Sequence, residues 1–198
     1  MLAAMDAERE LVAPIMLLAM PQVADPFFRK SVVLLLAHEK EGSFGFIVNR
    51  ATELRIVDIL RDLELEWGGD AAELARFGGP VQPQVGTVLF AAGGPPPELE
   101  DSTEIVPGVR LTQNRSAFAK LASAPPPRLR LLLGYAGWGE GQLVGEIVRN
   151  DWLTAPVDVE LIFGGGTEET WERALRSVGI DPAALPAWTE SELDTEAN

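Results

Sequence analysis

A glycine-rich segment from Gly134 to Gly141 has the residue types and spacing with the clearest capacity for chemistry. Its four glycines surround Trp138, between an apolar run and a helix predicted from about Gln142 to Arg149. A strand, a glycine loop and a helix in this order present backbone N–H groups and a helix N-terminus to an anion. The segment therefore predicts a ligand site formed by Gly134, Gly137, Trp138, Gly139 and Gly141.

Two arginines lie on the predicted strand that precedes this segment. Arg128 and Arg130 are two residues apart, so they lie on one face of a strand. No acidic residue occurs between Ile105 and Gly139. A phosphorylated or nucleotide-like ligand would suit this arrangement, with both arginines as its charged partners. Glu140 would repel an anion, and the opposing interpretation is a packing turn with Trp138 in the core.

Other kinds of catalytic site have little support. The spacing Gly-x-Gly-x-Gly matches neither a P-loop nor a dinucleotide fingerprint. The chain has no cysteine and a single histidine, His38, which has no metal-ligand spacing around it. Ser31 and Ser43 do not lie in a nucleophile elbow. We therefore predict no catalytic residues, no metal and no cofactor.

The charge and hydropathy of the chain limit its partners. The formal net charge is −14 and the pI is about 4.4, a field that repels nucleic acid and anionic membrane. The apolar run Leu11–Met20 is too short to span a bilayer, and acidic residues precede it. A cytoplasmic protein is the simplest interpretation, and we expect neither nucleic acid nor membrane as a partner.

The predicted elements describe a single α+β domain with a large mixed, largely antiparallel sheet flanked by helices. Ser31–Ala37 and Phe44–Asn49 are expected to pair as an antiparallel hairpin near the centre of the sheet. Further predicted strands are Val85–Ala92, Thr103–Val106, Val109–Thr112, Arg128–Tyr135 and Val157–Phe163, and Ile15–Met20 is a short apolar run that ends at Pro21. Predicted helices are Thr52–Leu65 (capped by Thr52), Ala71–Arg76, Asn114–Ala122 (capped by Asn114) and one capped by Thr167.

The expected boundaries follow from composition. Residues 1–13 are predicted to be a flexible lead-in, residues 14–188 the domain, and residues 189–198 an acidic tail without structure.

Three stretches of the sequence resemble the bacterial YqgE/AlgH family over roughly Leu11 to Leu185. The first contains Ala19–Pro21, Asp25–Phe28, Ser31–Val33 and Gly45–Asn49; the second is Gly78–Val81; the third contains Gly134–Gly139, Gly141–Leu143, Glu146–Ile147 and Asn150–Leu153. The resemblance implies a compact α/β domain with a large mixed sheet. It implies no reaction, because this family has no established one; the label "transcriptional regulator" has spread from one member linked to alginate synthesis.

These observations favour a non-enzymatic binding or regulatory protein that acts through a protein partner or a small anionic ligand. The alternative is an enzyme or sensor that holds a phosphorylated or nucleotide-like ligand at Gly134–Gly141. Direct DNA binding is the third hypothesis, based on the family label and the basic stretch alone. The oligomeric state stays open, with a monomer slightly favoured.

Overall fold

The computed structural model describes residues 11–91, 99 and 101–186. Its described strands form one ten-stranded sheet. The strands are β1 (Ile15–Ala19), β2 (Val32–Glu39), β3 (Gly42–Ile47), β4 (Ala51–Arg55), β5 (Leu74–Phe77), β6 (Val81–Ala91), β7 (Thr103–Val106), β8 (Val109–Thr112), β9 (Arg128–Gly139) and β10 (Trp152–Ala155).

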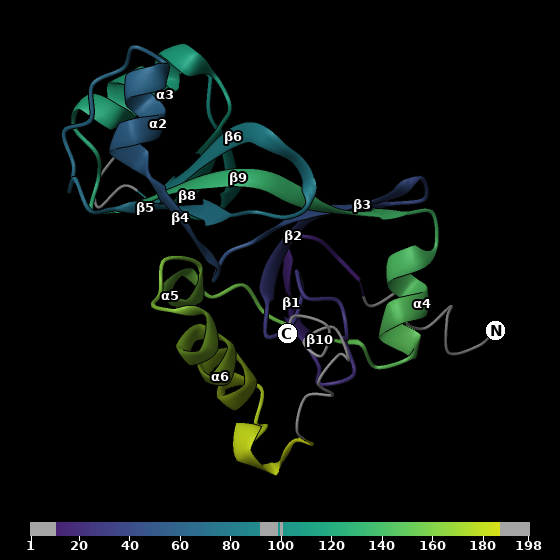
Figure 1. The fold of residues 1–198 in the computed structure, drawn as a ribbon. Helices are drawn as coiled ribbons and strands as arrows, with labels where there is room; N and C mark the ends of the chain where they lie inside the picture. The colour runs from purple at the N-terminus through teal and green to yellow at the C-terminus, as the bar shows by residue number, and fades with distance from the viewer. Residues whose placement is uncertain (1–10, 92–98, 100, 187–198) are drawn as a thin grey trace, which may run out of the picture.

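The helices lie in three places around the sheet (Figure 1). They are α2 (Ile56–Asp62), α3 (Arg115–Ser123), α4 (Gln142–Val148), α5 (Val159–Ile162) and α6 (Thr167–Ser177), followed by a 3-10 turn at Pro182–Ala184. Helices α2 and α3 lie together at one end of the molecule, α4 lies at the other end, and α5 and α6 lie together below the sheet.

The sheet confirms the predicted α+β class with a large, mostly antiparallel sheet. The strand order is β10-β1-β2-β3-β9-β6-β8-β7, and β5 joins β4 to β9 beside this path. Only the pair of β5 with β9 is parallel among the described strands; the other pairs are antiparallel.

The predicted central hairpin is confirmed. Strands β2 and β3 are antiparallel neighbours, with Leu34 opposite Phe46 and Glu39 opposite Gly42. Both strands have further partners, β1 and β9, on their outer sides. Alternate residues of β2 belong to two different buried clusters, Leu34 to one and Val33 to the other. The strand is therefore buried on both faces, which explains its continuous apolar run.

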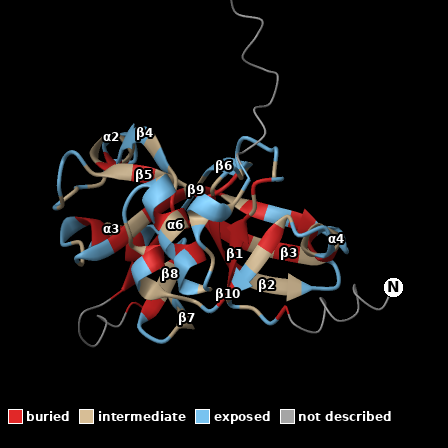
Figure 2. Ribbon diagram, turned by 90° about the horizontal axis from the view of Figure 1, so that it is seen from below, coloured by how far each residue is buried: buried red, intermediate tan, exposed pale blue. Residues whose placement is uncertain are grey.

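The buried side chains of the described residues form three clusters. Figure 2 marks the buried residues in red, many of them along the strands of the sheet. The cluster between the sheet and helices α5 and α6 packs Leu161, Trp171 and Leu175 against β2 and its neighbours. The opposite sides of the same strands contribute Val33 and Leu35 to a cluster that includes Leu143 of α4. The remaining cluster packs α2 and α3 against β6 and β9. Helix α4 thus rests on the end of the sheet where β9 meets β3.

The alternation of side chains along β9 changes at Gly134. Leu129 and Leu131 face α2 and α3, whereas Ala136 and Trp138 face the cluster of α4. In a regular strand, side chains alternate between the two faces, so the odd-numbered leucines would lie on the face opposite to Ala136 and Trp138. Gly134 has a φ of +70°, a conformation that glycine adopts without steric cost.

Of the two predicted helices in the 52–76 region, the first is shorter than predicted and has a different cap, and the second is wrong. Thr52 does not cap a helix: its hydroxyl donates to the carbonyl of Ala75 at 2.8 Å, as part of the β4–β5 pair. Helix α2 begins only at Ile56, and Ala71–Arg76 contains the start of β5 in place of a second helix. Tertiary pairing with β9 overrides the helical propensity of this segment.

The predicted strand Val157–Phe163 is also wrong, since it contains the short helix α5. Asp158 caps this helix, because its side chain accepts a hydrogen bond from the Glu160 amide at 2.8 Å. The strand of this region is β10, which pairs with β1 through Trp152 and Ala19. A short apolar run fits a buried helix as well as a strand.

The ends of the chain are described in part. Residues 1–10 of the predicted lead-in and the predicted 189–198 tail lie outside the described residues. Leu11 is buried in the cluster of α4. In the described part of the chain, no helix has the length and apolar character needed to cross a membrane.

Candidate functional site

The predicted glycine loop is largely a strand. Strand β9 continues to Gly139 and pairs with β3, with Phe44 opposite Gly137 and Ser43 opposite Trp138. The expectation of a loop from Gly134 was therefore wrong. Backbone groups in this stretch form a ladder, where neighbouring amides point to alternate sides of the strand, so they do not converge on one point as an anion-binding loop would require.

The predicted site residues do not share one location. Gly134 is buried within β9, where it crosses close to Gly79. The Gly139 amide donates to Gln142 Oε1 at 3.1 Å, and Gly141 is the N-cap of α4, which has seven residues. Trp138 is buried at 5% exposure.

Arg128 and Arg130 lie at the beginning of β9, away from these glycines. Arg128 pairs with Glu160, and Arg130 pairs with Glu73 at 3.1 Å. The Arg130 guanidinium also donates to the carbonyls of Phe163 and Gly164 at 2.8 and 3.1 Å. Burial lowers the pKa of Arg130, and Arg76 lowers it further. The structure thus connects these arginines to α5 and the loop before α6.

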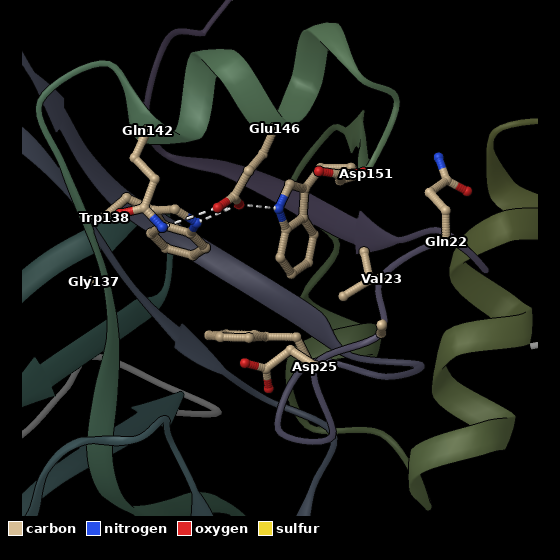
Figure 3. A pocket seen from close by; sticks show the side chains of 11 residues that line it. Gln22, Val23, Asp25, Gly137, Trp138, Gln142, Glu146 and Asp151 are labelled. Atoms are coloured by element: carbon tan, nitrogen blue, oxygen red, sulfur yellow. Dashed lines mark hydrogen bonds between the residues drawn. The ribbon is translucent and has the colours of Figure 1, made fainter. Parts of the chain in front are cut away.

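A cavity of about 240 Å³ lies beside the end of β9, and two predicted residues, Gly137 and Trp138, line it. Four segments enclose this cavity: the turn between β1 and β2, the end of β9, helix α4 and the start of β10 (Figure 3). Its lining residues are Gln22, Val23, Ala24, Asp25, Phe28, Gly137, Trp138, Gln142, Glu146, Asp151 and Trp152. We call it the α4 cavity.

Glu146 holds two tryptophans together at the α4 cavity. Its Oε2 atom accepts hydrogen bonds from Nε1 of Trp138 and from Nε1 of Trp152, both at 2.8 Å. Its Oε1 atom accepts a hydrogen bond from Nε2 of Gln142 at 3.0 Å. Gln142 and Glu146 are four residues apart, so they share one face of α4. Figure 3 shows these side chains directed toward one another.

Three aromatic rings pack mutually at this site. The Trp138 and Trp152 rings are 5.9 Å apart at 82°, and Phe28 lies 5.7 Å from Trp152 at 83°. Phe28 also lies 6.0 Å from Trp138. Edge-to-face geometry of this kind is favourable for aromatic pairs. The two indoles are buried, whereas Phe28 is half-buried.

Hydrogen bonds hold the turn that contributes Phe28. The carboxylate of Asp25 accepts from the Phe27 amide at 2.7 Å. Arg50 donates to the carbonyls of Pro26 and Arg29, both at 2.7 Å. The Gln22 side chain donates to the carbonyl of Asn150, which connects this turn to the segment before β10. The α4 cavity is thus preorganised by contacts within the protein.

The lining of the α4 cavity is acidic and aromatic. Asp25, Glu146 and Asp151 contribute carboxylates, and the described lining residues include no lysine or arginine. Within the described part of the chain, no group of three or more His, Cys, Asp or Glu residues could hold a metal ion. Carboxylates beside aromatic rings are the groups that contact cationic or polarised groups.

The structure has two other hollows and a contact between two polar side chains, His38 and Ser43, outside the α4 cavity. A hollow of about 520 Å³ shares Gly137 and Trp138 with the α4 cavity and is also lined by Phe44 and Tyr135; one of about 200 Å³ lies between Trp67 and Arg130. His38 Nδ1 lies 2.8 Å from Ser43 Oγ across the β2–β3 hairpin. Ser43 is buried, so this pair is a cross-strand contact.

Sequence reasoning missed most of the cavity residues. Asp25, Phe28, Glu146, Asp151 and Trp152 were not predicted as site residues, although all five belong to stretches that carry the family resemblance. The i, i+4 spacing of Gln142 and Glu146 is the local signal that could have indicated a polar helix face. The approach of the Asp25–Phe28 turn to α4 is a long-range contact that no local pattern encodes.

Comparisons with known proteins agree with this fold. The AlgH-like family model matches residues 16–183. The chain is 39% identical to a UPF0301 protein of Myxococcus xanthus, over 88% of this chain and 94% of that protein. It is 41% identical to a UPF0301 protein of Paracoccus denitrificans, over 86% and 91% of the two chains.

Two solved structures are also similar. The solution structure of the AlgH protein from Pseudomonas aeruginosa has a TM-score of 0.67 at 30% identity, over 87% of this chain and 94% of that chain. The crystal structure of protein DIP2367 from Corynebacterium diphtheriae has a TM-score of 0.71 at 21% identity, over 85% and 87%, and shows the same fold. From the family match and these identities, the chain belongs to the AlgH-like family.

Proposed function

We propose that this chain is a non-enzymatic binding protein whose ligand group enters the α4 cavity, and that it acts in the cytoplasm as a regulatory component. The observation that carries the proposal is the fixed arrangement in which Glu146 accepts hydrogen bonds from Trp138 and Trp152 beside an open volume. Rigid walls with a few polar groups are typical of ligand sites.

The size of the α4 cavity supports a small ligand or one side chain of a partner protein. Its volume of about 240 Å³ is below the ~300–1,000 Å³ of pockets for drug-sized molecules. The polar lining atoms of Glu146 are already hydrogen-bonded to Trp138, Trp152 and Gln142. A group bound there would meet a prepared surface and would need no rearrangement of these residues.

The other hypotheses receive less support. A phosphorylated ligand at Gly134–Gly141 would need converging amides and a positive field, but the segment is paired in the sheet and the neighbouring cavity is acidic. Direct DNA binding would have to overcome the net charge of −14.

A thermal-shift screen tests the proposal. The library should contain amines, guanidines, carboxylates, phosphates and uncharged compounds of up to about ten heavy atoms. A ligand present at 100 times its Kd should stabilise the protein by roughly 2.7 kcal/mol. We expect at least one class to stabilise the parent protein and to lose this effect in Phe28→Ala, which removes one wall of the α4 cavity.

Leu63→Ala is the matched control, because Leu63 is an exposed apolar residue just after α2. It should leave the ligand response unchanged. A library in which no class stabilises the protein, or in which both variants respond like the parent, would contradict the proposed site.

A further inference from the structure

We infer that the α4 cavity binds a small organic cation, an ammonium or guanidinium group, whether it belongs to a free metabolite-sized amine or to a side chain of a partner protein. This inference rests on the proposed function, and it specifies the ligand class. It is based on the Glu146 carboxylate, whose hydrogen-bond donors are neutral, on the aromatic lining and on the charge of the whole chain.

Glu146 is a half-buried carboxylate held by neutral donors. Its three side-chain hydrogen bonds come from two indoles and one amide. Among the residues that the structure describes, no lysine or arginine forms an ion pair with Glu146. A carboxylate that is partly removed from water without a counter-charge is costly, and a cation in the adjacent volume would neutralise it.

The other two carboxylates add to this negative potential. Asp151 pairs with Arg149 at 2.8 Å. Burial lowers the pKa of Arg50, and the nearby charge of Asp25 opposes that shift. Both arginines are absent from the residues that line the cavity in the described chain, whereas both aspartates line it. Three carboxylates thus line the cavity, and its described lining residues include no lysine or arginine.

The aromatic rings supply the second kind of contact that a cation needs. Phe28, Trp138 and Trp152 lie within 6.0 Å of one another and all line the cavity. Ring faces attract ammonium and guanidinium groups, and aromatic lining is the usual recognition surface for quaternary ammonium ligands. The carboxylates supply charge, and the rings supply shape and polarisable surface.

The charge of the chain would help a cation to reach this site. With a net charge of −14, the protein raises the local concentration of cations, and an acidic cleft focuses that field. An anionic ligand would face the opposite effect at every stage of its approach.

Calorimetric titration with matched probes tests the ligand class. Choline and its uncharged carbon isostere 3,3-dimethylbutan-1-ol differ in charge and little in shape, and methylguanidinium and acetate extend the comparison. We expect choline or methylguanidinium to bind at least roughly tenfold more tightly than the isostere and acetate.

Variants locate the binding. Glu146→Gln keeps the shape of the side chain and removes its charge, and Asp25→Asn keeps an acceptor for the Phe27 amide. Each should weaken cation binding by roughly fivefold or more. Asp62→Asn is the control, because it removes one negative charge as the other two variants do. Asp62 is exposed at the end of α2, outside the α4 cavity, so this variant should bind as the parent does.

Peptides distinguish the two sources of the cation. A short peptide with one arginine should be compared with its citrulline counterpart and with methylguanidinium. Tighter binding of the arginine peptide than of methylguanidinium points to a partner protein, and equal binding points to a free amine or guanidine; both support the inference.

If the carbon isostere or acetate binds through Phe28 as tightly as choline, the ligand class is wrong while the proposed site stands. If no probe binds, the inference is overturned, and the library screen then decides the site.

Discussion

At the residue scale, one carboxylate organises the candidate site. Glu146 accepts two indole N–H groups on a single oxygen, and both indoles are almost fully buried. Each indole N–H would be left without an acceptor if the carboxylate were removed. Glu146 therefore contributes to stability as well as to ligand binding.

Substitution of Glu146 should reveal this structural contribution. We expect Glu146→Ala to lower the free energy of unfolding by roughly 2–4 kcal/mol, because two buried donors lose their charged acceptor. Glu146→Gln should cost roughly 1–2 kcal/mol, because a neutral acceptor remains. Urea unfolding followed by tryptophan fluorescence measures both. Glu140→Gln, at an exposed position before α4, should change stability by less than about 0.5 kcal/mol, and equal effects at 140 and 146 would refute the role of Glu146.

Two glycines with the same backbone conformation offer a second test at this scale. Gly134 and Gly141 have φ values of +70° and +68°. A Cβ atom at Gly134 would lie 2.3 Å from the carbonyl oxygen of Gly79, whereas one at Gly141 would meet nothing within 4 Å.

We therefore expect Gly134→Ala to be much more destabilising than Gly141→Ala. The left-handed conformation alone should cost roughly 1–2 kcal/mol in both variants. Gly134→Ala should cost at least about 2 kcal/mol more, since the backbone at Gly79 would have to move away from β9. Thermal unfolding measures the difference, and equal losses at the two positions would show that the close approach of Gly79 has no energetic weight.

At the element scale, the helix that follows β8 depends on its N-cap. The Oδ1 atom of Asn114 accepts a hydrogen bond from the Ala117 amide at 3.0 Å, as predicted from the sequence. Asn114→Ala should lower stability by roughly 1 kcal/mol, and Asn114→Asp should restore most of it. Chemical denaturation measures both, and an unchanged midpoint for Asn114→Ala would contradict the cap.

Elements with strong local signals could be predicted from the sequence. The β2–β3 hairpin, the β7–β8 hairpin around Pro107–Gly108 and helix α3 all have turn or cap residues that specify them. Strands β4 and β5 could not be predicted, because they form by pairing with each other and with β9. The glycine-rich end of β9 has the composition of a loop, and only its pairing with β3 makes it a strand.

The same distinction applies to the candidate site. Gly137 and Trp138 were found because their local spacing is unusual, and both line the α4 cavity. Phe28 and Trp152 meet across 124 residues of sequence, a contact that only the assembled sheet produces.

At the scale of the whole molecule, the net charge of −14 predicts how the chain behaves toward nucleic acid. Any DNA binding should be weak, independent of sequence and abolished by modest salt. Fluorescence anisotropy with labelled duplexes at about 50 and 200 mM salt tests this, on the scale over which phosphate contacts lose affinity. Tight, salt-resistant binding to one sequence would contradict the prediction.

The central claim is that the α4 cavity is a binding site for a cationic group, and indole NMR tests it most directly. The chain has five tryptophans, so five indole N–H signals are expected, and those of Trp138 and Trp152 report on the carboxylate of Glu146. Titration with choline or methylguanidinium should shift these two signals in a saturable way. The signal of Trp67, which donates to the carbonyl of Asp70 at 2.8 Å, should stay in place. Cation titrations that leave Trp138 and Trp152 unchanged, or that shift all five signals alike, would contradict the account.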